Sequence, residues 1–531
     1  MGEKNRDNFV RDRLPVPQDQ PEFLFDLPEL AYPERMNAAA ELLAGKDRDA
    51  PAILNAAGRW SYGEIEDLSS RIARLLVEEE GLVPGNRVFL RGPNGATLFA
   101  AWLGILKAGG IVVATMPVLR GAEIAKLLNR AEISHAIVDD RGAEDFKTGA
   151  KQAGTLRSTL FYHGDEGGGN MEKRLERTAP GLAAIDTHRD DPALIAFTSG
   201  TTGEPKGCVH YHRDILASAD SFAAHIIRPK PGMRWACSAP LAFTFGLGQL
   251  FIFPFRFAGT AVTLEAPSPP VLLEAVARFK VDILATAPTA YRAMLPLLAE
   301  HDISSLEICV SAGEHLPAAT WHAWKEATGI GIIDGIGATE MMHIFISASG
   351  EDIRPGATGK PVPGYKACLL GENDQPLDPP AEGRLAVKGP TGCRYFDDPR
   401  QKDYVIKGWN VTGDTYREDD EGYFWYVARS DDMIVSAGYN IAAPEVENAL
   451  LSHEAVAECA VVGVPCEERG RKVKAFIVLA EGQAPGAALA EKLQAHVKAE
   501  IAPYKYPRAI EFVDSLPKTA TGKLKRHALR E

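Results

Sequence analysis

Short apolar runs alternate with amphipathic stretches from residue 51 onward, and this alternation limits the chain to a few fold classes. Leu68, Ile72 and Leu76 recur at helical spacing, which predicts a helix that extends to about residue 80. Strands that are apolar throughout, with helices between them, are typical of mostly parallel sheets covered by helices. The sequence therefore predicts an α/β fold, with short buried strands at residues 52–56, 87–90, 111–114, 135–138 and 283–286.

The length of 531 residues exceeds what one hydrophobic core usually supports. We predict a large N-terminal domain, residues 1–430, built of helix-covered mixed and parallel β-sheets, and a small mobile C-terminal α+β domain, residues 431–531. In the small domain Pro444 is expected in the first turn of a helix. Residues 456–464 and 473–479 are strand-like, and a second helix is predicted from Leu489, Leu493, Val497 and Ile501.

Composition excludes several classes of function. The net charge of −13 argues against broad nucleic-acid binding, which needs a clustered positive surface. The longest apolar stretch, residues 246–264, is interrupted by Pro254 and Arg256, which favours buried elements over a membrane span. Seven scattered cysteines and a first segment without an apolar signal core indicate a reducing compartment, and we expect the cytoplasm. His210 and His212 offer two metal ligands, but a third at a recognisable spacing is missing, so zinc is not favoured.

A glycine-rich loop follows the apolar run at residues 193–197. Residues 198–207 read TSGTTGEPKG, with three glycines, four hydroxyl-bearing side chains and Lys206. Glycine allows backbone N–H groups to approach an anion closely, and hydroxyls and a lysine add donors and charge. The spacing is not that of a Walker P-loop. By itself such a loop is often a plain surface turn, but its length and its place after a strand predict a phosphate-binding site.

Five further motifs accompany the loop in a fixed order. They are SAGEHLP at 311–317, GATE at 337–340, TGD at 412–414, ARSDDMI at 428–434 and PKTATGK at 517–523. In this combination the chain resembles the adenylate-forming superfamily of acyl-CoA synthetases, nonribosomal adenylation domains and luciferases. The resemblance covers essentially the whole chain after the first few dozen residues, and it implies ATP, Mg²⁺ and CoA as cofactors or co-substrates.

The resemblance assigns roles at the nucleotide. Glu340 matches the magnesium carboxylate, a hard oxygen ligand, and Thr339 would contact the α-phosphate. Asp414 would accept the ribose hydroxyls, backed by Arg429, although singly these residues are typical of a turn and of a surface ion pair. The expected β- and γ-phosphate contacts are Thr198, Ser199, Gly200, Thr201, Thr202, Gly203 and Lys206. The expected adenine contacts are Gly313, Glu314, His315, Asp334, Gly335, Ile336 and Gly337, with Ile336 standing where many relatives have an aromatic residue.

The same resemblance makes Lys523 the catalytic lysine that meets the acyl oxygen and the α-phosphate. Asp431 matches the hinge about which the small domain rotates between adenylation and thioester formation. After rotation the segment with Ser436, Ala437, Gly438 and Tyr439 would replace Lys523 and admit the pantetheine arm. Candidates for the CoA phosphates are Arg469, Arg471 and Lys472, which a solvated basic face explains equally well. The basic tail from Lys518 to Arg530 is a candidate for a local nucleotide site or a solvated tail, and its TGK match favours a functional role.

The acid is predicted from two short stretches, residues 239–248 and the residues after Glu340. The string TExxHIF at 339–345 resembles benzoate-CoA ligases and their 2-aminobenzoate relatives. The stretches at residues 7–15 and 27–35 resemble the 2-aminobenzoate branch. Flat aromatic walls suit an aryl ring, and the Thr244 hydroxyl would serve an ortho amino group. The expected wall residues, whose alternative is plain core, are Phe243, Thr244, Phe245, Gly246, His343 and Ile344.

These observations predict an AMP-forming aryl-CoA ligase, with 2-aminobenzoate favoured and benzoate next. An alternative is a stand-alone adenylation enzyme that loads an aryl acid onto a carrier protein, and a regulator without chemistry is disfavoured because Lys523 and Glu340 are both present. The expected partners are an aryl carboxylic acid, ATP and CoA, with no nucleic acid and no membrane; a homodimer remains an option.

Overall fold

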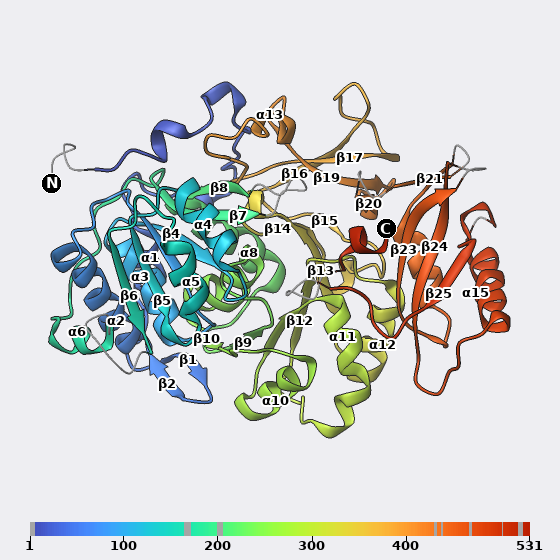
Figure 1. Cartoon of the computed structure of the whole chain (residues 1–531), viewed down its shortest axis with the longest axis horizontal. Coiled ribbons are helices and arrows are strands. Elements are labelled where there is room, and N and C mark those ends of the chain that lie inside the picture. Colours follow the sequence, from blue (N-terminus) through green and yellow to red (C-terminus); the bar gives the residue numbers. More distant parts are fainter. Residues whose placement is uncertain are drawn as a thin grey trace.

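The computed structural model describes residues 6–163, 171–198, 205–429, 433–436, 439–466, 470–501, 503–518 and 524–530. Figure 1 shows two helix-covered sheets in the first two thirds of the chain and a smaller unit, in orange and red, at the C-terminal end. The predicted α/β class, a large sheet-and-helix domain followed by a small C-terminal one, is confirmed. The exact boundary near residue 431 stays a prediction, because residues 430–432 lie outside the described part.

The first sheet carries the predicted phosphate loop. Its six strands run in the order β6-β5-β3-β4-β7-β8 and are parallel except for the β7–β8 pair. Strands β3 and β5 are buried at every position, which explains their continuous apolar sequence. The strands are β3 (Arg87–Arg91), β4 (Ile111–Thr115), β5 (His135–Asp139), β6 (Ser158–Tyr162), β7 (Pro192–Thr198) and β8 (Lys206–Tyr211).

Helix α2 (Tyr62–Arg74) shows how the local sequence begins a helix. The Ser61 hydroxyl accepts a hydrogen bond from the Glu64 backbone N–H, and the Glu64 carboxylate accepts one from the Ser61 N–H at 2.7 Å. The predicted helix does reach residue 79, through a π-helical turn. Other helices before residue 220 are α1 (Ala38–Leu43), α3 (Ala96–Lys107), α4 (Gly121–Arg130), α5 (Ala143–Ala150), α6 (Met171–Arg177) and α7 (His212–Ser218).

The second sheet has nine strands in the order β15-β14-β13-β12-β11-β9-β10-β1-β2. Its centre is parallel, and β2, β14 and β15 pair antiparallel at the two ends. The strands are β1 (Pro51–Asn55), β2 (Gly58–Ser61), β9 (Arg234–Cys237), β10 (Thr260–Val262), β11 (Ile283–Thr286), β12 (Ile308–Ala312), β13 (Ile332–Gly337), β14 (Ile344–Ser347) and β15 (Lys360–Pro361). The carboxyl ends of β12 and β13 are neighbours, since Ala312 pairs with Gly335.

The apolar stretch at 246–264 forms buried elements, as predicted. It contains the end of α8 (Thr244–Gly246), the π-helix η8 (Leu247–Ile252), α9 (Phe253–Arg256) and β10. None of the helices in the described ranges is long and apolar enough to cross a membrane. The remaining helices of this region are the π-helix η7 (Ala219–Ile227), α10 (Pro269–Phe279), α11 (Pro288–Met294), the 3₁₀-helix η9 (Leu295–Glu300) and α12 (Ala318–Thr328).

A third, antiparallel sheet follows and joins the large domain to the C-terminal unit. Its strands are β16 (Lys366–Leu370), β17 (Ala381–Lys388), β18 (Val405–Ile406), β19 (Trp409–Glu418) and β20 (Phe424–Arg429), with helix α13 (Gln401–Tyr404) beside it. The C-terminal unit contains the hairpin β21 (Ile434–Ser436) and β22 (Tyr439–Ile441), and the sheet β23 (Val456–Cys466), β24 (Gly470–Leu479) and β25 (Ala509–Phe512).

Two helices cover this small sheet. Helix α14 (Ala443–Leu451) has Pro444 in its first turn, as predicted, and α15 (Ala487–Glu500) buries Leu493 and Val497. The prediction was wrong at Ile501, which has extended backbone angles and ends α15 rather than continuing it. The unit has its own apolar cluster, which includes Ile434, Val446, Val461, Ile477 and Val497.

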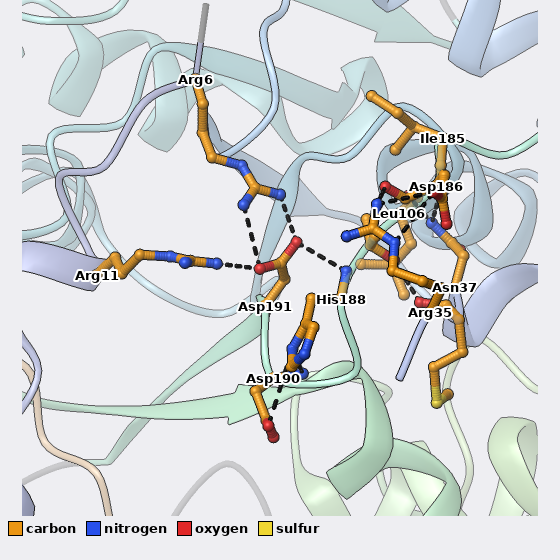
Figure 2. A network of polar contacts seen from close by, with 12 residues as sticks. Arg6, Arg11, Arg35, Asn37, Leu106, Ile185, Asp186, His188, Asp190 and Asp191 are labelled. Carbon is orange, nitrogen blue, oxygen red and sulfur yellow. Dashed lines mark hydrogen bonds and ion pairs between the residues drawn. The ribbon is translucent and has the colours of Figure 1, made fainter. Parts of the chain in front are cut away.

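The N-terminal segment is tied to the start of β7. Figure 2 shows Arg6 and Arg11 converging on Asp191, the residue before β7. Arg6 contacts both carboxylate oxygens, and the oxygen that Arg11 does not contact also accepts the His188 backbone N–H at 3.1 Å. Burial works against ionisation of Asp191, yet the hydrogen bonds from Arg6 and His188 and the charge of Arg11 hold its pKa below the usual value. The segment thereby fixes the strand that leads into the phosphate loop.

Candidate active site

The phosphate loop joins two antiparallel strands. Thr198 at the end of β7 pairs with Lys206 at the start of β8, so both lie at the same edge of the first sheet. Gly207 is required here, since a Cβ on it would lie 2.2 Å from the Phe396 ring. The predicted phosphate contacts Ser199, Gly200, Thr201, Thr202 and Gly203 lie outside the described residues and stay predictions.

Beside the loop lies the candidate magnesium carboxylate. Glu340 belongs to the 3₁₀-turn η10 (Thr339–Met341), is 8% exposed and accepts a hydrogen bond from the Tyr395 hydroxyl. The Lys206 Nζ lies 5.1 Å from the centre of the Tyr395 ring, a cation–π distance. Burial raises the pKa of Glu340, while the Tyr395 hydroxyl and the Lys206 charge oppose that rise. Burial destabilises the charged form of a carboxylate and a bound cation stabilises it, so Glu340 is a suitable ligand for a divalent cation.

Sequence reasoning missed Tyr395. It comes from the loop after β17 and bridges two predicted site residues that stand far from it in the chain. No local pattern marks it, because its role depends on how the third sheet packs against the first.

The backbone of Thr339 accepts a hydrogen bond from a histidine. The His210 Nε2 lies 2.8 Å from the Thr339 carbonyl oxygen and therefore donates to it. The neighbouring His212 makes a different contact, since its Nδ1 accepts the Ala38 backbone N–H at 3.1 Å. The two histidines considered as metal ligands thus serve separate hydrogen bonds, and no cluster of three or more metal-binding side chains occurs in the described ranges.

The predicted adenine segments lie side by side. Gly313, with φ of +90°, Glu314 and His315 follow β12, and Asp334, Gly335, Ile336 and Gly337 end the neighbouring β13. Burial raises the pKa of Asp334 to about 8, against hydrogen bonds from the Gly335 backbone and Ser311. The His315 ring stacks on Tyr426 at 5.5 Å.

The candidate ribose pair lies on two antiparallel strands. Asp414 of β19 is directly opposite Arg429 of β20, and their charged groups are 3.9 Å apart. Arg429 is half exposed, whereas Asp414 is largely covered. The arrangement agrees with the supporting role predicted for Arg429 and with a simple cross-strand ion pair.

The predicted wall residue His343 is surrounded by three aromatic rings, of which only Phe245 was among the predicted wall residues. His343 is 3% exposed, and its ring lies 5.8 Å from Phe245 in a stacked arrangement, 4.6 Å from Phe253 and 5.2 Å from Phe222. Burial lowers the pKa of His343 to about 3, so the ring is neutral. Thr244, also buried, is the first residue of α8, which carries Phe245 and Gly246.

The wall adjoins the adenine segment. Ile344 begins β14 and covers β13, since a Cβ on Gly335 would lie 2.6 Å from the Ile344 Cγ2. Phe243 precedes α8 and is half-buried. Met342, between Glu340 and His343, has a positive φ of +67°, which turns the chain from the candidate carboxylate to the wall.

The C-terminal unit meets the large domain at the adenine segment. The Asn448 Nδ2 of α14 lies 3.2 Å from the His315 Nε2, and Arg292 of α11 donates to the Val456 carbonyl at 2.7 Å. In the hairpin, Ser436 is buried and pairs with Tyr439. Arg471 is exposed and Lys472 half-buried, both on β24. Asp431, Ala437, Gly438, Arg469 and Lys523 lie outside the described residues, so their roles stay predictions.

The basic tail forms ion pairs through two of its cations. Lys518 binds Glu458 at 2.6 Å, and Arg526 makes two contacts to Glu447. A bridge between Lys518 and Leu524 brings together the two ends of the segment that contains Lys523. The tail is therefore anchored to the C-terminal unit and is not a free basic extension.

Comparison with known proteins decides the family. The AMP-binding enzyme model matches residues 41–395, and the AMP-binding enzyme C-terminal domain model matches residues 445–523. The chain belongs to the AMP-binding enzyme family. It is 37% identical to the benzoate–CoA ligase of Thauera aromatica over 514 residues, which cover 95% of this chain and 97% of that protein.

Solved structures agree over almost the whole length. The anthranilate CoA ligase AuaEII, solved with anthranoyl-AMP, superposes with a TM-score of 0.90 at 34% identity, covering 95% of this chain and 98% of that one. A benzoate CoA ligase from Burkholderia xenovorans LB400 gives 0.86 at 32% identity, covering 93% and 100%. The protein is accordingly an AMP-forming acid–thiol ligase, as its motifs predicted.

Proposed function

We propose that the protein is an ATP-dependent aryl-CoA ligase that prefers 2-aminobenzoate, with benzoate next. In the first half-reaction a carboxylate oxygen of the acid attacks the α-phosphorus of ATP and pyrophosphate leaves. In the second, the CoA sulfur attacks the acyl carbon and AMP leaves. Reducing surroundings, a cytoplasmic location and a homodimer remain predictions beside this proposal.

One observation carries the proposal more than any other. The candidate nucleotide carboxylate and the aromatic wall belong to a single turn, since Glu340 and His343 stand three residues apart across the positive φ of Met342. A rigid turn of this kind sets a short, fixed distance between the site where the carboxyl group reacts and the site that binds the rest of the acid. A flat ring stacked between Phe245 and neighbouring apolar side chains meets that requirement, whereas a long flexible chain does not.

The described residues supply binding and charge for the first half-reaction. Lys206 and the backbone around it would receive the phosphates, and the Tyr395 hydroxyl donates to Glu340, which favours the ionised carboxylate against the effect of burial. When bound there, Mg²⁺ would neutralise charge on the phosphates. Lys523 would contribute a further positive charge where the acyl oxygen meets the α-phosphate.

Both the related structures and the side chains of the predicted wall support the proposal that the substrate is an aryl acid. The two superposed structures are named for anthranilate and benzoate. The predicted wall residues are aromatic and aliphatic apart from Gly246, His343 and Thr244, and Thr244 carries a buried hydroxyl. A buried polar substituent loses affinity unless it finds a partner. The Thr244 hydroxyl is the partner that favours the amino-substituted acid in this proposal.

Acid-dependent exchange between ATP and pyrophosphate tests the proposal. The panel should contain 2-aminobenzoate, benzoate, hexanoate and octanoate, followed by thioester formation with CoA and with a phosphopantetheinylated carrier protein. We expect the two aryl acids to exceed both fatty acids in kcat/KM and CoA to accept the acyl group. Octanoate ahead of both aryl acids would refute the aryl assignment, and transfer to the carrier but not to CoA would favour a loading enzyme.

A further inference from the structure

A buried glutamine without a hydrogen-bond partner follows the aromatic wall. Gln249 is 0% exposed, and within the described residues neither its Oε1 nor its Nε2 finds a partner. Its neighbours Leu247, Leu250, Phe251 and Ile252 are all apolar and buried. A buried carboxamide without partners costs free energy that a leucine or methionine would not, because both amide atoms have lost water.

Gln249 lies close in the chain to the predicted acyl wall. The π-helix η8 continues α8 directly, so Gln249 lies one helical turn after Thr244 and Phe245. The preceding residue, Gly248, touches the wall itself, since a Cβ there would lie 2.4 Å from the His343 Cδ2. Neither ring nitrogen of His343 has a hydrogen-bond partner of good geometry in the described part either.

A π-helical turn also widens the segment at this point, and such turns occur frequently at functional sites. Thr244 and Gln249 are then the polar groups on two successive turns of one apolar segment. Among the described residues the other buried side-chain amides have hydrogen-bond partners. Gln401, for example, accepts the Tyr395 backbone N–H at 2.9 Å and donates to the Asp19 carbonyl at 2.9 Å. The lack of a hydrogen-bond partner is therefore specific to Gln249 among the buried amides that the structure describes.

We propose that Gln249 is a specificity-determining residue of the aryl-acid site, whose carboxamide hydrogen-bonds an amino or hydroxyl substituent on the ring. The Oε1 accepts the N–H or O–H of the substituent, and Thr244 serves the same substituent or a neighbouring ring position. The inference rests on the proposed aryl-CoA ligase function and extends it to the group that recognises the substituent.

The test compares acids of equal size. Methyl and amino groups fill similar volumes, so the ratio of kcat/KM for an aminobenzoate to that for the matching methylbenzoate reports hydrogen bonding and not shape. We would measure this ratio at the ortho and meta positions, with 2-hydroxybenzoate added, for the wild type, Gln249→Met and Gln249→Leu. For at least one position the ratio should fall about three- to tenfold in both variants, as expected for one neutral hydrogen bond.

Thermal unfolding of the ligand-free enzyme supplies the second readout. Gln249→Met should leave Tm unchanged or raise it, because the substitution removes two polar atoms without partners. The matched control is Gln401→Met, which removes an amide with partners and should lower Tm without changing the amino-to-methyl ratio.

An unchanged ratio at every position in a folded Gln249→Met or Gln249→Leu enzyme would overturn the inference. A lowered Tm together with an unchanged ratio would make Gln249 a structural amide bonded to an internal water. If the wild type activates no aryl acid at all, the proposed function fails instead, so the two failures are distinguishable.

Discussion

Tyr395→Phe isolates the hydrogen bond that holds the candidate metal carboxylate. The substitution removes only the hydroxyl that donates to Glu340 and keeps the ring beneath the Lys206 ammonium, 5.1 Å away. A hydrogen bond to a charged group contributes about 1.5–3 kcal/mol. One pKa unit corresponds to about 1.4 kcal/mol, so the pKa of Glu340, already raised by burial, should rise by a further one to two units.

The pH dependence of kcat/KM for acid-dependent pyrophosphate exchange measures this change, because it reports the ionisations of the free enzyme. Binding of a metal needs the ionised carboxylate, so activity is lost as pH falls through the pKa of Glu340. The acidic limb of the profile should therefore move to higher pH by about one to two units in Tyr395→Phe.

Tyr404→Phe is the matched control. The Tyr404 ring lies 5.9 Å from that of Tyr395, and its buried hydroxyl has no hydrogen-bond partner within the described ranges. Removal of this hydroxyl should leave the acidic limb in place. An unmoved limb in Tyr395→Phe, or an equal movement in both variants, would refute the reasoning.

Four further changes test other parts of the molecule. Lys523→Ala should nearly abolish adenylate formation but spare thioester formation from supplied aryl-adenylate, measured as separate half-reactions; equal loss of both would contradict its role. Thr244→Ala should lower the kcat/KM preference for 2-aminobenzoate over benzoate by up to about tenfold, and an unchanged ratio would remove Thr244 from the amino group. Asp414→Ala should raise the KM for ATP equally at every magnesium concentration, whereas a magnesium-dependent defect would argue for a metal role. Asp191→Asn should lower the free energy of unfolding at neutral pH by about 1–2 kcal/mol, after allowance for the partly exposed Arg6 and Arg11, and so lower Tm. Because the pKa of Asp191 is depressed, its contribution is present above the unfolded pKa and lost as pH falls, so the difference in Tm from the wild type should vanish in acid.

The elements were predictable where the information is local. Strand and helix positions follow from periodicity, and β3, β4, β5 and β11 stand where the apolar runs predicted them. The ends of elements were less predictable, because they depend on local contacts such as the Ser61 capping box that begins α2 at Tyr62. Ile501 has the right spacing but lies after the last turn of α15.

Only those residues of the candidate site that belong to sequence motifs were predictable. Ordered strings identified Lys206, Glu340 and Asp414, but not Tyr395, whose contact depends on the packing of two sheets. Gln249 escaped notice for a different reason. It stands in an apolar run, and only the structure shows that its amide lacks partners in the part of the chain that is described.

The turn from Glu340 to His343 explains why nucleotide and acid recognition are coupled in our proposal. The His210 hydrogen bond fixes Thr339 at one end, and the rings of Phe222, Phe245 and Phe253 enclose His343 at the other. With both ends held, and Met342 in a backbone conformation that non-glycine residues rarely adopt, the turn has little freedom to lengthen. In this proposal the backbone of the turn sets the distance between the phosphates and the aromatic wall. Side chains such as Thr244 and Gln249 can therefore select the substituents on a flat acid, but not the length of the acid.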